Sequence, residues 1–180
     1  MRFAAVWPRM RSAQAIARKR VPLGFAVAVV TLVLADPTWG SWRAGLLVAI
    51  VGEAMRVWAA GHLEKSREVT QSGPYRWVGH PLYVGSSLVA LGVVIAARHT
   101  VVTALALTYM IVTIGAAIRT EESFLRERFG ETYDLYRESR AEPVQRRFSL
   151  ERVRRNREYR ALFGIAGGFA LLALKIRGTL

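Results

Sequence analysis

The sequence predicts an all-α integral membrane bundle of about five transmembrane helices, with polar loops on the cytoplasmic side. Three observations lead to this fold class. Hydrophobic residues make up 52% of the 180 residues and the mean hydropathy is positive, which is too apolar for an ordinary soluble domain. The chain nevertheless carries 26 Lys and Arg against 13 Asp and Glu. Finally, most of its apolar residues gather in five long stretches.

The five stretches are candidates for membrane-spanning helices. They cover residues 21–35, 44–63, 82–97, 100–118 and 161–176. A helix that crosses a bilayer needs about 20 apolar residues, with a lower limit of about 17, so the first and last stretches are short.

The first stretch follows a basic leader, residues 1–20, which has six Arg and Lys and no acidic residue. Cleaved secretory signals share this pattern, and the run Val33-Leu34-Ala35 would suit a cleavage site. The leader is unusually long, however, and the tight link of residues 38–43 leads directly into the second stretch. We therefore expect the first two stretches to form an uncleaved helical hairpin.

The positive charges predict which ends of the helices lie in the cytoplasm, because Lys and Arg are enriched in cytoplasmic loops. Residues 119–160 hold twelve Arg, and the loop 63–80 is also basic, whereas the opposite links contain only Arg43, Arg98 and His99. Two hairpins would thus bring both polar segments to one cytoplasmic face, and the last stretch would cross back. Anionic lipid headgroups account for these charges, so membrane lipids are expected partners and nucleic acid is not.

A single domain is expected, because no low-complexity linker divides the chain. We predict one membrane domain over residues 1–180: a basic cytoplasmic leader (1–20), a four-helix core (21–118), a cytoplasmic segment (119–160) and a C-terminal membrane helix (161–176). Within the cytoplasmic segment, the fourth helix should stop at Gly130 and a short helix should follow over residues 131–138. A charged helix should then lie at the headgroup level over residues 145–160.

Disulfides and thiolate metal sites are excluded, since the chain has no cysteine. The three histidines, His62, His80 and His99, lack metal-ligand spacing. No metal site is expected.

The junction between the loop 63–80 and the third stretch holds the most informative motif. Two short runs carry it, Gly73-Pro74-Tyr75 and His80-Pro81-Leu82-Tyr83. Pro81 suits the first position of a helix, which places His80 at a helix start, where free N–H groups favour an anion such as a carboxylate. Tyr75 and Tyr83 offer hydroxyls and aromatic faces for a nucleoside. The plainer interpretation is an interfacial aromatic belt beside a helix that begins with proline.

A second motif, Glu121-Glu122, ends the fourth stretch. Adjacent glutamates at the end of a membrane helix need solvent, a partner or a bound cation, and they would suit an amino group or ribose hydroxyls. Alternatively, the helix is simply solvated and Glu122 pairs with Arg126 one turn later.

Charged residues inside the second stretch form a third candidate. Glu53 and Arg56 lie three residues apart on one helix face, and ionisable groups at membrane depth usually face a partner or a polar cavity. Either the two residues neutralise each other, or Arg56 orients an anionic substrate while Glu53 holds the arginine in place. His62 either lines the same cavity or bonds water and backbone near the interface.

Taken together and in this order, the motifs resemble the isoprenylcysteine carboxyl methyltransferase family, a group of integral membrane methyltransferases related to phospholipid methyltransferases. The resemblance covers about residues 53–143. It rests on His62 to Ser66, Gly73 to Tyr75, His80 to Tyr83, Glu121-Glu122, Phe129-Gly130 and Tyr133 to Tyr136.

The resemblance implies cytoplasmic loops that bind S-adenosylmethionine, and a lipophilic acceptor that enters from the bilayer. The implied cofactor-binding residues are His62, Arg67, Glu68, Val69, Thr70, Tyr75, His80, Pro81, Leu82, Tyr83, Glu121 and Glu122. The candidate catalytic residues are Arg56, Glu53 and Arg119. The expected location is a bacterial inner membrane, with the N-terminus and the cofactor site in the cytoplasm.

Two positions depart from the family pattern. Gly79 stands directly before the His-Pro pair, where members often have arginine. Ala117 stands four residues before Glu121, where the family has an arginine expected to engage a substrate carboxylate. Arg56 and Arg119 are the candidates to replace it.

We predict methyl transfer from S-adenosylmethionine to a lipophilic acceptor, with the carboxylate of a prenylcysteine-like compound as one candidate. A carboxylate is already an anionic nucleophile, whereas an amine or alcohol needs a general base, for which Glu53 and His80 are available. Two other functions stay open: an NADPH-dependent membrane reductase of the sterol reductase type, and a non-catalytic membrane protein that binds lipid or a partner through its basic face.

Overall fold

The computed structural model describes residues 7–65, 67–141 and 144–178, with side chains from residue 21 onward. All regular structure in these ranges is helical, which confirms the predicted fold class. The elements are α1 (Trp7–Leu34), α2 (Trp39–His62), the 3-10 helix η1 (Gly73–Arg76), α3 (Pro81–Ala97), α4 (Thr100–Phe129), α5 (Glu131–Arg137), α6 (Leu150–Arg155) and α7 (Tyr159–Ile176). Residues 1–6 of the predicted leader and Ser66 of the first matching run lie outside the described residues. From Trp7 onward, the backbone of the leader is helical and continuous with the first apolar stretch.

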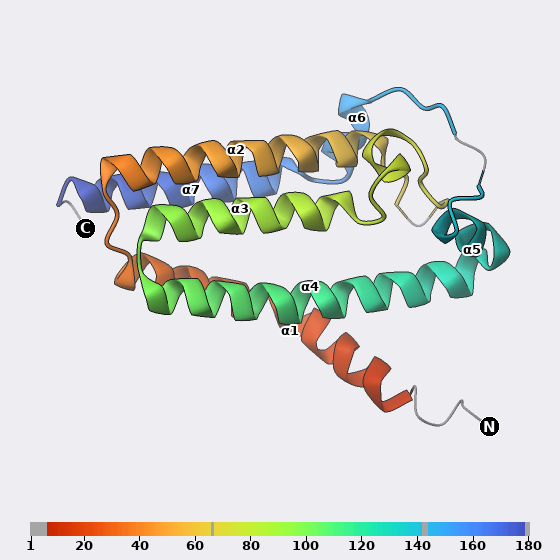
Figure 1. Cartoon of the computed structure of the whole chain (residues 1–180), viewed down its shortest axis with the longest axis horizontal. Coiled ribbons are helices and arrows are strands. Elements are labelled where there is room, and N and C mark those ends of the chain that lie inside the picture. The colour runs from red at the N-terminus through yellow and green to blue at the C-terminus, as the bar shows by residue number, and fades with distance from the viewer. Residues whose placement is uncertain (1–6, 66, 142–143, 179–180) are drawn as a thin grey trace.

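The long helices lie side by side and alternate in direction (Figure 1). The α1–α2 and α3–α4 links lie at one end of the bundle, together with the C-terminus. The loop between α2 and α3 lies at the other end, with α5 and α6. Both polar segments therefore meet at one end, as the two predicted hairpins require.

Three of the described helices, α2, α4 and α7, are long and apolar enough to cross a membrane. The apolar helical segments Val21–Leu34 and Pro81–Ala97 are shorter. Large apolar side chains such as Phe25, Ile111 and Phe163 are mostly exposed on the outside of the bundle, where hydrocarbon rather than water suits them. The chain is an integral membrane protein.

The helices α2 and α3 pack closely because glycines of one face the backbone of the other. A Cβ on Gly45 would come within 2.3 Å of the Gly92 carbonyl oxygen, and a Cβ on Gly52 within 2.7 Å of the Gly85 carbonyl oxygen. Small residues let helix backbones approach in a membrane, where van der Waals packing drives association. This contact holds the start of α3 against the end of α2.

The polar segment 119–160 agrees with the sequence prediction as far as α5 and differs after it. The helix α4 stops at Gly130, whose φ is +47°, and α5 follows. The predicted helix over residues 145–160 is wrong, because residues 144–149 are not helical and α6 has only six residues. The backbone there bonds to α2 instead, since the Ser149 N–H donates to the Gly61 carbonyl at 3.1 Å.

Candidate active site

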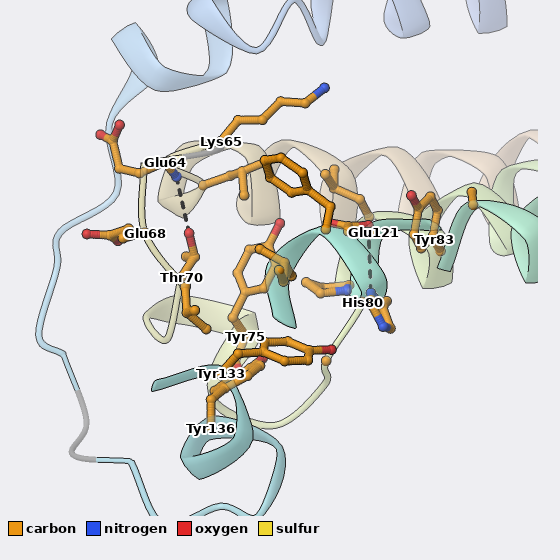
Figure 2. Close-up of a pocket in the computed structure, with 18 of the residues that line it drawn as sticks. Glu64, Lys65, Glu68, Thr70, Tyr75, His80, Tyr83, Glu121, Tyr133 and Tyr136 are labelled. Atoms are coloured by element: carbon orange, nitrogen blue, oxygen red, sulfur yellow. Dashed lines mark hydrogen bonds and ion pairs between the residues drawn. The ribbon is translucent and has the colours of Figure 1, made fainter. Parts of the chain in front are cut away.

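A cavity of about 600 Å³ opens at the polar end of the bundle. Its walls come from residues 63–65 and 68–70, the start of α3, the end of α4, and α5 (Figure 2). The structure brings nine of the predicted cofactor-binding residues together in these walls: Glu68, Val69, Thr70, Tyr75, His80, Pro81, Leu82, Tyr83 and Glu121. The predicted residues His62, Arg67 and Glu122 do not line the cavity. We call this space the polar cavity.

His80 joins the two predicted motifs. It directly precedes Pro81, the first residue of α3, so its ring lies at the N-terminal end of that helix. The ring lies beside the glutamates at the end of α4, with Nε2 3.3 Å from Glu122 Oε1 and Nδ1 3.9 Å from Glu121 Oε2. Runs some forty residues apart in the chain therefore form one side of the polar cavity.

Arg137 of α5 completes the charge pattern around these glutamates. Its Nη1 lies 3.0 Å from Glu122 Oε1 and 4.0 Å from the place that a Cβ on Gly79 would take. The alternative pairing of Glu122 with Arg126 is not found, because Arg126 contacts Asp134 at 3.2 Å. Arg137 therefore places a positive charge beside the glutamates, although residue 79, where the family often has arginine, is a glycine.

Two buried tyrosines present unpaired hydroxyls to the polar cavity. Tyr75 is 8% exposed and Tyr133 is 1% exposed, and neither hydroxyl has a hydrogen-bond partner among the described residues. Burial, together with the nearby Glu121, raises the pKa of Tyr75, and burial also raises the pKa of Tyr133, so both hydroxyls stay protonated at neutral pH. Leaving a buried hydroxyl unpaired costs about 1–3 kcal/mol. A polar ligand in the cavity would remove that cost.

His62 packs behind the outer wall of the polar cavity, against Ser72 and Gly73. Its Nδ1 lies 3.2 Å from Ser72 Oγ, and a Cβ on Gly73 would come within 2.4 Å of the ring. Glycine is required there for a second reason, because its φ is +58°. In front of His62, Thr70 Oγ1 accepts the N–H of Glu64 at 3.2 Å. His62 therefore shapes the wall, while the side chain of Arg67 is exposed.

Arg56 lies between two carboxylates rather than one. Its Nε is 3.2 Å from Glu53 Oε2, which makes an ion pair. The two groups are not aligned as a hydrogen bond, so neither Arg56 Nε nor the Glu53 oxygens have a hydrogen-bond partner among the described residues. Its Nη2 donates to Glu158 Oε2 at 2.7 Å, and its Nη1 donates to Ser86 Oγ. The simple neutral pair is thus replaced by a cluster of two acids and one base. Arg119, the third predicted catalytic residue, is exposed and lines neither cavity.

A second cavity, of about 520 Å³, lies between the helices and is mostly apolar. Residues of α1, α3, α4 and α7 line it, and we call it the apolar cavity. It shares four lining residues with the polar cavity: Arg56, Tyr83, Ser86 and Ala117. These four residues lie where the two cavities adjoin, and we call this place the junction.

Sequence reasoning missed some of the lining residues. Tyr133 belongs to a run that carries the resemblance, but only the structure shows that it is buried in the cavity wall with an unpaired hydroxyl. Glu158 precedes the last apolar stretch by a few residues, and no local spacing connects it with Arg56, which lies about a hundred residues earlier. Ala117, where the family pattern has arginine, is buried and lines both cavities.

Comparisons with known proteins identify the family of the chain. The chain is 32% identical over 133 residues to the cobalt-zinc-cadmium resistance protein CzcN of Cupriavidus metallidurans, and the match covers 66% of this chain and 62% of that protein. No solved structure matches the chain. Residues 39–132, which carry the glycine contact, His80 and the glutamate pair, match the phospholipid methyltransferase family. The chain belongs to the phospholipid methyltransferase family.

Proposed function

We propose that this protein transfers a methyl group from S-adenosylmethionine to a lipophilic acceptor that enters from the bilayer. The observation that carries the proposal is the junction of the two cavities, because a polar cofactor and an apolar acceptor need separate spaces that meet at one point. Membership of the phospholipid methyltransferase family supports the same reaction class.

The residues of the polar cavity suit the chemical groups of S-adenosylmethionine. At the start of α3, Pro81 has no N–H and the next turn donates to the His80 carbonyl, so the Leu82 N–H is the backbone donor left for a carboxylate. Glu121 and Glu68 offer acceptors to an ammonium group or to ribose hydroxyls. The unpaired hydroxyls of Tyr75 and Tyr133 can bond any remaining polar atoms of the cofactor.

Once bound, the cofactor supplies an electrophilic methyl group, and the acceptor must approach it in line. Positioning therefore provides much of the rate enhancement. Ser86 and Tyr83 line both cavities at the junction, so they are placed to orient the reacting atom of the acceptor. The apolar walls beyond them would hold its hydrocarbon chain and exclude water.

The charge at the junction bears on the identity of the acceptor. A prenylcysteine-like carboxylate needs a cation, and Arg56 already contacts Glu53 and Glu158. A carboxylate would therefore have to displace Glu158, whereas an amine or an alcohol would not. For those acceptors, Glu53 and His80 are the candidate bases.

The first experiment is a thermal unfolding assay of the detergent-purified protein with S-adenosylhomocysteine and, separately, with NADPH. A ligand that binds only the folded state raises the unfolding temperature. We expect S-adenosylhomocysteine alone to do so. Stabilisation by NADPH alone would favour a reductase, and stabilisation by neither would favour a non-catalytic role.

A second experiment identifies the acceptor. The protein is incubated with methyl-labelled S-adenosylmethionine and a lipid extract from its own host, and labelled products are separated by mass. We expect one labelled lipid, formed by wild-type protein and formed more slowly by Tyr133→Phe at limiting cofactor. A base-labile methyl ester would indicate a carboxylate acceptor, and a stable N-methyl or O-methyl product would indicate an amine or an alcohol.

We also propose that the polar cavity faces the cytoplasm of a bacterial inner membrane. The concentration of Arg and Lys at that end of the bundle supports this orientation.

A further inference from the structure

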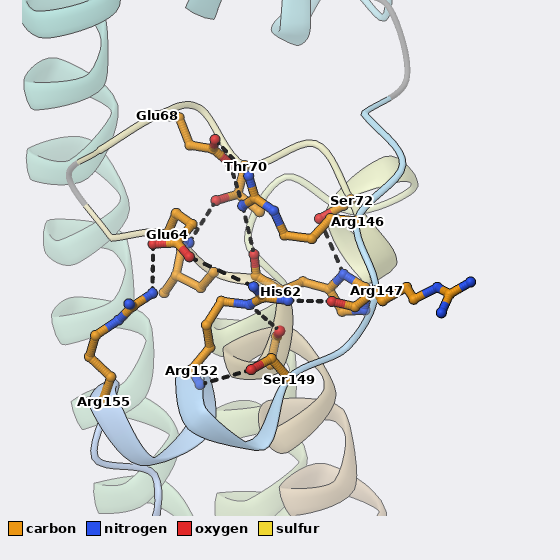
Figure 3. Close-up of polar contacts among 12 residues, drawn as sticks. His62, Glu64, Glu68, Thr70, Ser72, Arg146, Arg147, Ser149, Arg152 and Arg155 are labelled. Atoms are coloured by element: carbon orange, nitrogen blue, oxygen red, sulfur yellow. Dashed lines mark hydrogen bonds and ion pairs between the residues drawn. The ribbon is translucent and has the colours of Figure 1, made fainter.

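Residues 144–158 form a strap that crosses the end of α2 and lies outside the part of the chain that matches the family (Figures 1 and 3). The strap sits directly on α2, because the ring of Phe148 takes the space in which a Cβ on Gly61 would lie, only 2.2 Å away. The Ser149 N–H also donates to the Gly61 carbonyl. Residue 61 therefore has no room for a side chain beside the Phe148 ring.

Side chains of the strap satisfy the carbonyl groups at the C-terminus of α2. Arg152 Nε donates to the Gly61 carbonyl at 2.7 Å. Asn156 Nδ2 donates to the carbonyls of Ala60 at 3.0 Å and Leu63 at 3.1 Å. The last carbonyls of a helix have no partner within the helix, so the strap replaces solvent at this end.

The strap also holds two glutamates that line the polar cavity. Arg146 grips Glu68 with both terminal nitrogens, at 2.5 Å for Nη1 to Oε1 and 2.8 Å for Nη2 to Oε2. Arg155 Nη2 donates to Glu64 Oε2 at 2.6 Å. Burial would raise the pKa of Glu64, but the hydrogen bond from Arg155 and the nearby arginines outweigh it and lower the pKa. The glutamate therefore stays charged and bound to the strap.

At its far end, the strap delivers a residue to the junction of the cavities. Arg157 has a left-handed backbone, with φ +61°, which is uncommon for a residue other than glycine. The next residue, Glu158, is buried, and its Oε2 accepts a hydrogen bond from Arg56 Nη2 at 2.7 Å. The strap thus contacts both the outer wall of the polar cavity and Arg56, which lines both cavities.

We propose that the strap retains the cofactor: Arg146 is a positioning residue that holds Glu68 and the adjacent cavity wall in place, and releasing this clamp lets the cofactor leave. This inference rests on the proposed function. A two-pronged arginine–carboxylate contact is directional and strong, yet here it is partly exposed, with side-chain exposure of 21% for Arg146 and 38% for Glu68. Such a clamp can open without disturbing the apolar bundle.

The test compares Arg146→Ala with Arg147→Ala in the full-length protein in detergent. Arg147 is the next residue of the strap, and its side chain points away from the cavity wall (Figure 3), so the control removes the same charge from the same segment. Two quantities are measured: hydrogen exchange of residues 67–72 without ligand, and the dissociation rate of labelled S-adenosylhomocysteine. We expect Arg146→Ala alone to speed both, with dissociation about tenfold faster for the loss of a charged two-pronged contact.

Rescue keeps the test independent of folding. The charge swap Arg146→Glu with Glu68→Arg should restore slow hydrogen exchange of residues 67–72, whereas Arg146→Glu alone should exchange faster than Arg146→Ala. Dissociation is compared only in the Arg146 and Arg147 variants, because Glu68 itself lines the polar cavity. The proposal is overturned if Arg146→Ala and Arg147→Ala exchange alike, or if the wall loosens while dissociation is unchanged. If wild-type protein fails to bind S-adenosylhomocysteine, the proposed function fails, and the exchange measurement still reports on the clamp.

Discussion

At the scale of single residues, the site depends on polar groups whose partners lie far away in the sequence. His80 meets Glu121 and Glu122 across some forty residues, and Arg56 meets Glu158 across about a hundred. The sequence predicted the first meeting, because one motif begins the third apolar stretch and the other follows the fourth, on the same predicted side of the membrane. It did not predict the second, because Glu158 reaches Arg56 only through a non-helical segment that charge patterning had marked as helix.

The tyrosine hydroxyls give the sharpest residue-scale prediction. Tyr133→Phe removes an unpaired buried hydroxyl, so stability should be unchanged or rise by about 1 kcal/mol, while S-adenosylhomocysteine binding weakens about tenfold. Tyr136→Phe is the matched contrast, since its hydroxyl donates to the Tyr75 carbonyl at 2.8 Å and burial raises its pKa to about 12. That variant should lose about 1 kcal/mol. Thermal unfolding and calorimetric titration measure both; equal cofactor affinity in Tyr133→Phe and wild type would remove this hydroxyl from the site.

The cluster around Arg56 predicts unequal costs for its members. Arg56→Met would strand two buried carboxylates and should cost about 3–5 kcal/mol. Glu158→Gln leaves Glu53 and Arg56 balanced one to one, so it should cost clearly less. Denaturation of the purified variants measures the difference. Equal losses would mean that Glu158 is as necessary to the charge balance as Arg56, which the geometry does not support.

At the scale of elements, the close contact of α2 with α3 is the fixed part of the site. Glycines at Gly45, Gly52, Gly85 and Gly92 let the two backbones touch, and this contact sets where the start of α3 lies relative to Arg56. The helices themselves were predictable from apolar stretches and from Pro81. The close packing of α2 on α3 was not predictable, because the sequence alone does not show which helix a glycine in a membrane helix faces.

A pair of glycine substitutions tests this contact. Gly45→Ala places a Cβ 2.3 Å from the Gly92 carbonyl oxygen and should lower stability by about 1–3 kcal/mol through overpacking. Gly115→Ala is the control within another helix, because no atom lies within 4 Å of its new Cβ, and alanine is the better helix former. Thermal unfolding in one detergent compares them. A similar result for both variants would argue against close packing of α2 on α3.

At the scale of the whole molecule, the polar segments are concentrated at one end of the helical bundle. Polar loops, short helices and the strap occupy one end of the bundle, and the opposite end carries only short links and the C-terminus (Figure 1). Charge counting predicted this asymmetry, since the loops at the two ends differ so strongly in Arg and Lys. It did not predict how the polar pieces pack against each other, because that depends on specific contacts such as Phe148 against Gly61.

The absence of cysteine from the sequence makes the orientation easy to measure. Single cysteines are introduced at Ser139, at the polar end, and at Gly40, near the α1–α2 link; both positions are exposed. A membrane-impermeant thiol reagent applied to intact cells should label Gly40→Cys. It should label Ser139→Cys only after the cytoplasmic side has been opened. The reverse pattern would place the polar cavity outside the cytoplasm.

The walls of the two cavities come from different parts of the chain. Residues from the part that matches the family supply most of the polar cavity, whereas α1 and α7, which flank that part, supply much of the apolar one. Substitutions in the flanking helices would therefore alter the size and shape of the acceptor space while leaving the donor space intact. If the two cavities hold donor and acceptor as we propose, such a protein can acquire a new substrate through its outer helices while its donor site stays unchanged.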